Sequence, residues 1–77
     1  MYKLKRSAAK LQQEYKTFNI YNYNEDGTPG TFITTTPLVK LAVVVCNRAE
    51  EQGSTYCITG VKTDGTEALL ERSDSRA

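Results

Sequence analysis

The segment TPLVKLAVVVCNRAEEQG, residues 36–53, decides the fold because it carries the start and stop signals of a helix. Thr36 is a favourable N-cap, and Pro37 suits the first helical position, where its missing N–H would have no partner. Gly53 suits the left-handed residue that ends many helices. The β-branched run 43–45 favours a strand instead, but a strand would leave residues 49–52 unexplained, so we predict a helix. Apolar residues at helical spacing predict its buried face: Leu38, Leu41, Ala42, Val45 and Ala49.

A hairpin precedes this helix in the predicted fold. Residues 17–23 are rich in aromatic side chains and place Phe18 and Ile20 on one face of a strand. A stretch of turn-forming residues follows, and residues 31–35 again favour a strand, with Phe32 expected in the core.

A second hairpin follows the helix. Residues 55–62 and 66–71 read as strands, and Asp64-Gly65 between them is a strong hairpin signal. We therefore predict an α+β domain over residues 17–72, with two layers: a four-stranded, mainly antiparallel sheet made of two hairpins, and one covering helix. Residues 73–77 are predicted to form a flexible tail.

The N-terminal segment, residues 1–16, is basic. It holds five Lys and Arg against Glu14 alone, a local charge of +4 (five minus one). Leu4, Leu11 and Tyr15 fall near helical spacing and Ser7 suits an N-cap, which predicts a short helix. The alternation of apolar and basic residues at the start of the segment favours a strand, and this alternative stays open.

Composition limits the classes of protein that this chain can represent. The chain has 77 residues, 39% of them hydrophobic, and a net charge of +1, which describes one small soluble domain and neither a strongly basic nucleic-acid binder nor an acidic DNA mimic. The longest apolar run, residues 41–46, is too short to cross a membrane. With no apolar leader after the first basic residues, we expect a cytoplasmic protein whose cysteines, Cys46 and Cys57, are reduced.

The residues available for chemistry argue against an enzyme. The chain has no histidine, which removes the usual general base near neutral pH and most zinc ligand sets. The glycines match no phosphate-binding or dinucleotide-binding motif, and no metal-ligand pattern occurs. We expect no catalytic residue, no metal and no cofactor.

Aromatic residues before the first turn point to binding. If residues 15–23 form one strand, a strip of rings and amides shares the face opposite Phe18 and Ile20. Tyrosines give large, rigid contacts with a polar tip, which suits a protein-binding surface. The N-terminal helix or a second copy of the chain would cover the same strip equally well. Together with four turn carboxylates that suit attraction to a basic groove, the candidate partner-binding residues are Tyr15, Asn19, Tyr21, Tyr23, Glu25, Asp26, Asp64 and Glu67.

Two other functions remain open. A single-stranded nucleic acid would stack on the tyrosines and be held at its phosphates by the basic N-terminal segment, through Lys3, Lys5, Arg6, Lys10 and Lys16. The chain would otherwise be a structural domain that pairs with its own copy through the open face of the sheet.

The later part of the chain resembles small phage- and mobile-element-encoded accessory proteins of the anti-CRISPR type. The resemblance covers residues 31–72: Thr36-Pro37 opening a helix, the run 48–53 closing it, then Tyr56-Cys57-Ile58 and Asp64-Gly65-Thr66. It implies a non-enzymatic inhibitor or adaptor that acts in the cytoplasm of a bacterial host, in a host–virus interaction, by occupying the surface of a larger protein or ribonucleoprotein defence complex. The resemblance concerns the order of the predicted elements and the size of the chain, and it assigns no functional residue.

Overall fold

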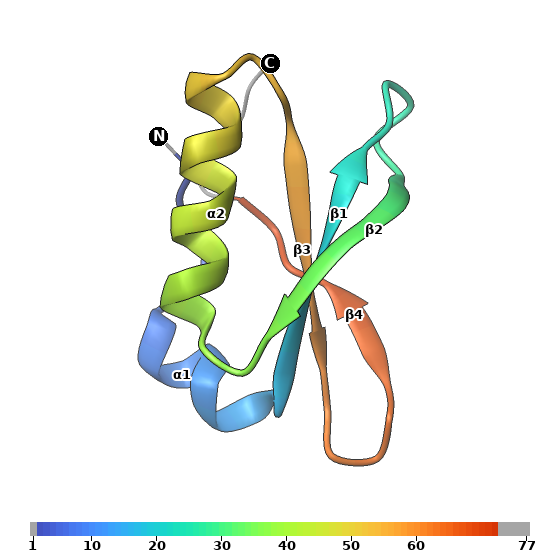
Figure 1. The fold of residues 1–77 in the computed structure, drawn as a ribbon. Helices are drawn as coiled ribbons and strands as arrows, with labels where there is room; N and C mark the ends of the chain where they lie inside the picture. The colour runs from blue at the N-terminus through green and yellow to red at the C-terminus, as the bar shows by residue number, and fades with distance from the viewer. Residues whose placement is uncertain (1, 73–77) are drawn as a thin grey trace.

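The computed structural model describes residues 2–72, which form one sheet and two helices (Figure 1). The elements follow one another as helix α1 (Ala8–Glu14), strands β1 (Thr17–Tyr23) and β2 (Pro29–Thr36), helix α2 (Val39–Glu51), and strands β3 (Tyr56–Val61) and β4 (Glu67–Leu69). The strands lie in the order β2-β1-β3-β4 with every neighbouring pair antiparallel. The predicted α+β class and four-stranded antiparallel sheet are therefore confirmed, but the sheet is accompanied by two helices and not by one.

The core lies between α2 and the sheet face that carries Phe18 and Ile20. These two side chains and Ile58 are completely buried, and Ile20 pairs directly with Ile58 across β1 and β3. Helix α2 covers this inner face with its own buried residues: Val39, Ala42, Cys46 and Ala49. Strict alternation along β1 thus selects the inner side chains, as the sequence predicts.

The predicted buried face of α2 is partly wrong. Ala42 and Ala49 are buried and Val45 is partly buried, but Leu38 and Leu41 are about half exposed, at 51% and 50%. The helix begins at Val39, later than Pro37, so Leu38 precedes its first turn. Val39 and Cys46 then face the core in place of the two leucines, because positions spaced by three and four residues lie on one side of a helix.

The start of α2 is capped by a side chain from α1. Gln12 accepts a hydrogen bond from the Val39 N–H at 3.0 Å and donates one to the Pro37 carbonyl at 2.6 Å. Thr36 accepts from the Leu38 N–H at 3.2 Å. Because the helix begins at Val39, this bond does not satisfy the N–H of the first helical residue. The first turn of a helix leaves N–H groups without intrahelical partners, so the Gln12 amide supplies what no local residue supplies.

The N-terminal segment is part of the same core. The predicted helix is present as α1, capped by the Ser7 hydroxyl, which accepts from the Lys10 N–H at 3.3 Å. Leu11 and Tyr2 are each only 1% exposed and belong to the cluster that holds Phe18 and Ile58. The described part of this segment, residues 2–16, therefore contributes side chains to the same core as the sheet. The expected tail, residues 73–77, lies outside the described residues.

The two ends of the described chain meet beside Tyr2. Leu4 and Arg72 form an isolated antiparallel bridge, and the Arg72 guanidinium stacks over the Tyr2 ring, 4.1 Å from its centroid. Arg72 also forms a 2.7 Å ion pair with Glu50 of α2, and both side chains are less than a fifth exposed. Arg72 thus ties the chain after β4 to the N-terminal segment and to α2.

The cap contributed by Gln12 can be tested against its neighbour. We expect Gln12→Ala to lower the free energy of unfolding by about 1 kcal/mol, because it removes the cap of another helix. Gln13→Ala, at an exposed position of the same helix, should change it by less than about 0.5 kcal/mol. Urea denaturation measures the free energy of unfolding of both variants. Equal losses would show that Gln12 contributes only its helix propensity within α1 and not a cap of α2.

The link through Arg72 yields a second prediction. Arg72→Met should lower the free energy of unfolding by about 2 kcal/mol, because it removes both the partly buried ion pair with Glu50 and the contact with the Tyr2 ring. Lys5→Met is the matched control: its ion pair with Glu71 is exposed, so the loss should stay below about 0.5 kcal/mol. Thermal unfolding followed by circular dichroism separates the two, and a tolerant Arg72→Met would contradict the assignment.

Candidate functional site

The sheet face opposite α2 carries a compact group of polar and aromatic side chains. Asn19 and Tyr21 alternate with the buried Phe18 and Ile20 along β1, so they point away from the core. We call the group the outer cluster, and its members are Asn19, Tyr21, Phe32, Thr59 and Glu67. Its residues come from all four strands, so only the assembled sheet brings them together (Figure 1).

The carboxylate of Glu67 is the centre of the outer cluster. Its Oε2 atom accepts hydrogen bonds from the Thr59 hydroxyl at 2.5 Å, from the Tyr21 hydroxyl at 2.8 Å and from the Asn19 amide at 3.4 Å. Glu67 stands on β4, its donors on β1 and β3. The bonds therefore connect three neighbouring strands across the outer face.

These hydrogen bonds shift two pKa values in opposite directions. Donation from Thr59, and next from Tyr21, stabilises the ionised carboxylate and lowers the pKa of Glu67 below its usual value. Donation to Glu67 favours the neutral phenol and raises the pKa of Tyr21. Near neutral pH the cluster therefore holds one carboxylate and one phenol donor.

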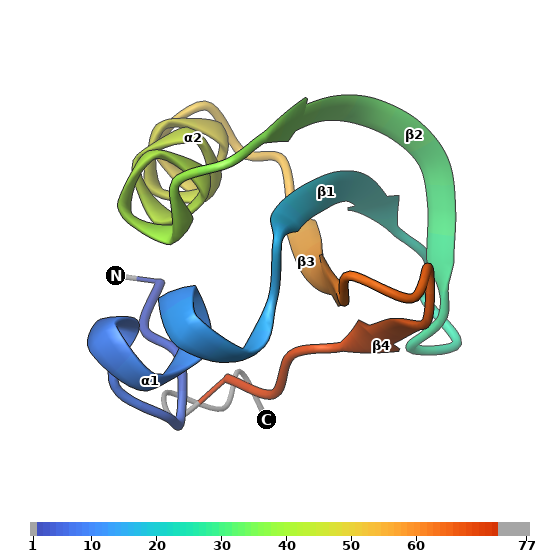
Figure 2. The same ribbon diagram turned by 90° about the horizontal axis from the view of Figure 1, so that it is seen from below.

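Phe32 lies in the outer cluster and not in the core, which corrects the prediction. Its ring is 51% exposed and meets the Tyr21 ring edge to face, with centroids 5.7 Å apart. The pairing of β1 with β2 shifts register between Ile20 and Tyr21, where Ile33 becomes an extra residue on β2. Such a bulge increases local twist, and Figure 2 shows β2 curving around β1.

The other two tyrosines of the predicted strip have different positions. Tyr15 is wrong as a surface residue: it precedes β1, is 7% exposed and packs edge to face on Phe18. Gly60 makes room for it, because a Cβ there would lie 2.5 Å from the Tyr15 ring. Tyr23 is exposed at the end of β1. A single strand over residues 15–23 does not form: Tyr15 is the C-cap of α1, where its N–H donates to the Leu11 carbonyl, and β1 begins only at Thr17.

The remaining acidic candidates do not form one patch. Asp26 accepts from the Thr28 hydroxyl at 2.6 Å and from the Thr28 N–H at 3.1 Å, and these bonds lower its pKa. Asp64 accepts from the Thr66 N–H at 2.9 Å, which lowers its pKa. Glu25 is exposed beside Asp26 in the β1–β2 connection. That connection and the one holding Asp64 lie at opposite ends of the sheet (Figure 1). Both aspartates thus stabilise turns, and Glu67 alone joins the outer cluster.

The basic candidates are not gathered around the tyrosines. Lys5 pairs with Glu71 at 3.4 Å and Arg6 pairs with Glu14 at 2.5 Å, both within the chain. Lys3, Lys10 and Lys16 are exposed. Figure 2 shows α1 beside α2, away from the curve of β2 over the outer face. The expected combination of basic residues with Tyr21 is therefore not assembled.

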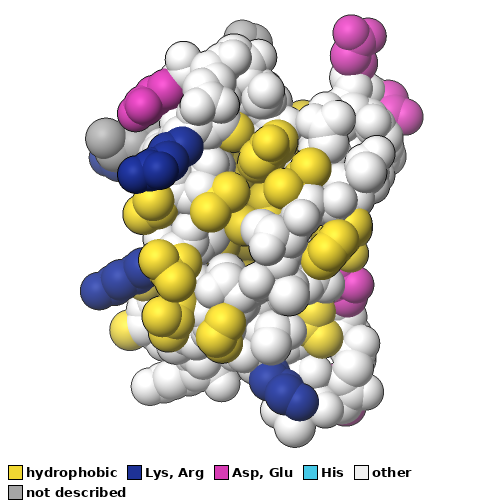
Figure 3. Space-filling model, in the orientation of Figure 1, with side chains coloured by type: hydrophobic (Ala, Val, Ile, Leu, Met, Phe, Trp, Pro, Cys, Tyr) yellow, Lys and Arg dark blue, Asp and Glu magenta, His cyan; other side chains and the backbone are white. Residues whose placement is uncertain are grey.

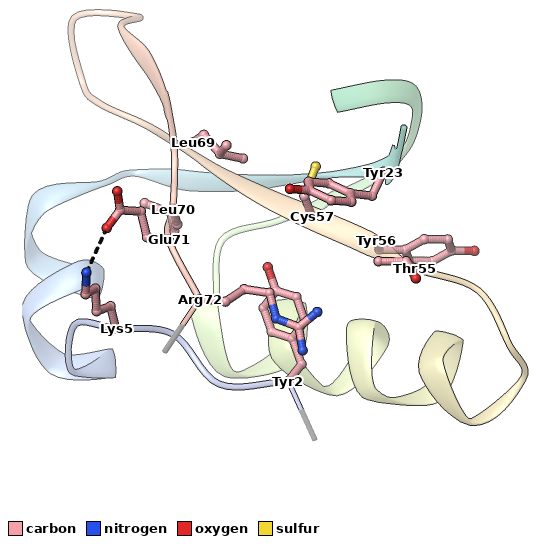
Figure 4. Close-up of a pocket in the computed structure, with 10 residues that line it drawn as sticks. All are labelled: Tyr2, Lys5, Tyr23, Thr55, Tyr56, Cys57, Leu69, Leu70, Glu71 and Arg72. Carbon is pink, nitrogen blue, oxygen red and sulfur yellow. Dashed lines mark hydrogen bonds and ion pairs between the residues drawn. The ribbon is translucent and has the colours of Figure 1, made fainter. Parts of the chain in front are cut away.

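A cleft of about 460 Å³ opens where β4 leaves β3 (Figure 4). Tyr23 and Cys57 form one wall, and the Arg72–Tyr2 stack forms another. Cys57 is only 3% exposed, and burial raises the pKa of its thiol. Burial also raises the pKa of Cys46 to about 12, and both thiols are free, as predicted.

A second exposed feature is apolar and lies on α2 and on the residue before its first turn. Leu38, Leu41 and Val44 are each about half exposed, and Figure 3 shows hydrophobic side chains gathered over α2 and the adjoining sheet.

Neither helix of the described region has the length and apolar character needed to cross a membrane. Between residues 2 and 72, no group of three or more acidic or cysteine side chains is placed to hold a metal ion.

Sequence reasoning found Asn19, Tyr21 and Glu67 but missed Thr59 and Phe32. Thr59 carried a usable signal, because it alternates with the core residue Ile58 and therefore faces outward. No local signal revealed Phe32, because a bulge depends on the partner strand.

No protein-family model, curated protein or solved structure matches this chain.

The opposed pKa shifts predict a pH window for the hydrogen bond between Tyr21 and Glu67. We expect Tyr21→Phe to lower the free energy of unfolding by about 0.5–1 kcal/mol near neutral pH. The lowered pKa of Glu67 means that this stabilisation declines as pH falls below about 5, and the raised pKa of Tyr21 means that it declines as pH rises above about 10.

Tyr23→Phe is the matched control, because no described residue forms a hydrogen bond with the Tyr23 hydroxyl. Its effect near neutral pH should be small. Urea denaturation at a series of pH values measures both variants, and a Tyr21→Phe effect that is constant from pH 3 to 11 would contradict the assignment.

Proposed function

We propose that this protein is a small non-enzymatic inhibitor or adaptor that binds a larger protein through the outer cluster. The observation that carries the proposal is the hydrogen bond between the half-buried Tyr21 and the exposed Glu67 on the sheet face that α2 does not cover. The partner class that fits the resemblance to anti-CRISPR proteins is a protein or ribonucleoprotein complex of a bacterial defence system.

The aromatic pair supports this proposal by its exposure. Phe32 places half of its ring in solvent next to Tyr21. Aromatic side chains dominate the binding energy of many interfaces because they bury a large area and lose little conformational freedom. Here the strands and the hydrogen bond to Glu67 already restrict Tyr21, so little ordering is left for binding.

The charge of the outer cluster supports a basic surface as the complement. Glu67 is its one ionised side chain, and the acidic connection with Glu25 and Asp26 lies at one end of the same sheet (Figure 3). On the face that Figure 3 shows, most Lys and Arg side chains lie over the helix layer, and one lies at the bottom of the view. A partner surface that binds the phosphates of a nucleic acid is basic. Such a surface would be attracted to the acidic sheet side of this protein.

Affinity capture with matched variants tests the proposal. The tagged wild-type protein is incubated with bacterial lysate, and the retained proteins are quantified by mass spectrometry. We expect a retained partner whose recovery falls at least about tenfold with Phe32→Ala, because an aromatic anchor contributes about 2 kcal/mol or more. Leu41→Ala is the control, since Leu41 on α2 is as exposed as Phe32 and should leave recovery unchanged.

Equal recovery with Phe32→Ala and the wild type would contradict the proposal. The nucleic-acid alternative is examined with the same proteins. If the wild type binds single-stranded oligonucleotides at low salt, and if neutralising the five basic candidates flattens the salt dependence, that function replaces the proposed one.

A further inference from the structure

We propose that the outer cluster recognises an arginine side chain of the partner protein, with the guanidinium bound to Glu67 and stacked against Phe32. This inference rests on the proposed function, since it names the group that the same face binds. Three observations lead to it: the occupancy of the two carboxylate oxygens, the rings beside them, and the rigidity of both.

The two oxygens of Glu67 differ in their surroundings. All three hydrogen bonds from Asn19, Tyr21 and Thr59 end on Oε2, and within residues 2–72 no donor reaches Oε1. The side chain is exposed, and no cation of the described chain pairs with it. A carboxylate that is ionised and partly open to solvent is complemented by a cationic donor.

The rings next to this carboxylate favour arginine over lysine. Tyr21 touches both neighbours, with its ring against Phe32 and its hydroxyl on Glu67. A guanidinium is planar and weakly hydrated, so it can stack on an aromatic ring while its N–H groups point to a carboxylate. An ammonium is compact and strongly hydrated, and it gains less from the rings. The pairing of carboxylate and ring therefore selects a planar cation.

The geometry is already set before any partner arrives. Phe32 and Tyr21 are paired across β2 and β1, and the hydrogen bonds hold Glu67 of β4 over β3. A receptor site in which the charged group is fixed by its own hydrogen bonds loses little freedom on binding. The same bonds keep Glu67 ionised into acidic solution, because they lower its pKa.

The test uses a short probe in place of the partner. Amide signals of the ¹⁵N-labelled wild-type protein are followed by NMR while an acetylated, amidated Gly-Arg-Gly peptide is added to about 20 mM, a range suited to one exposed contact. Lysine and citrulline versions of the peptide serve as comparisons. Citrulline keeps the planar shape but has no charge. We expect shift changes at Tyr21, Thr59 and Glu67 that are at least threefold larger with arginine than with either comparison peptide.

Protein variants assign the contacts. Glu67→Gln should reduce the arginine-induced shifts at least fivefold, and Phe32→Ala at least twofold, with well-dispersed spectra showing that both variants fold. Glu51→Gln is the control, because Glu51 is exposed on α2 and its removal changes net charge equally. Equal responses to arginine and lysine, unchanged responses in Glu67→Gln, or no response to arginine would each overturn the inference.

The outcome separates this inference from the proposed function. If the arginine probe has no effect but Phe32→Ala still loses the captured partner, the outer cluster binds a different group and the proposed function stands. If neither experiment depends on the outer cluster, both fail.

Discussion

The antiparallel pairing of β1 with β3 is the contact on which the rest of the structure depends. These strands belong to different hairpins, and their register, with Ile20 opposite Ile58 and Phe18 opposite Gly60, joins the hairpins into one sheet. The same register sends one set of side chains toward α2 and the other to the outer face. Because a shift of one residue would exchange the two faces, the buried core and the outer cluster are specified together.

Residues near both ends of the described region, 2–72, stabilise this small sheet. Tyr2 and Leu11 enter the core from the N-terminal side, Arg72 closes over Tyr2 from the other, and Gln12 caps α2. A domain of this size buries a limited area, so segments outside the hairpins contribute a large share of the apolar contacts. The sheet face opposite α2 is consequently left to polar and aromatic side chains.

Much of the fold could be predicted because its signals are local. The turn at Asp64-Gly65, the alternation through Phe18 and Ile20 and the apolar run of α2 all act within a few residues. The predictions were wrong where a segment distant in the sequence sets the start of a helix or the burial of a side chain. Leu38 was expected inside because Thr36 and Pro37 resemble a helix start, yet Gln12 caps the helix two residues later.

The sequence by itself determined the class of fold and the outward position of Asn19 and Tyr21, since period-two alternation and turn chemistry act through neighbouring residues. Only the tertiary structure decided that Tyr15 is buried, that Phe32 is exposed and that Glu67 meets Tyr21 across β3. Each of these depends on which strand lies beside which and on a bulge between two of them. Such pairings join residues far apart in the chain, and no local pattern encodes them.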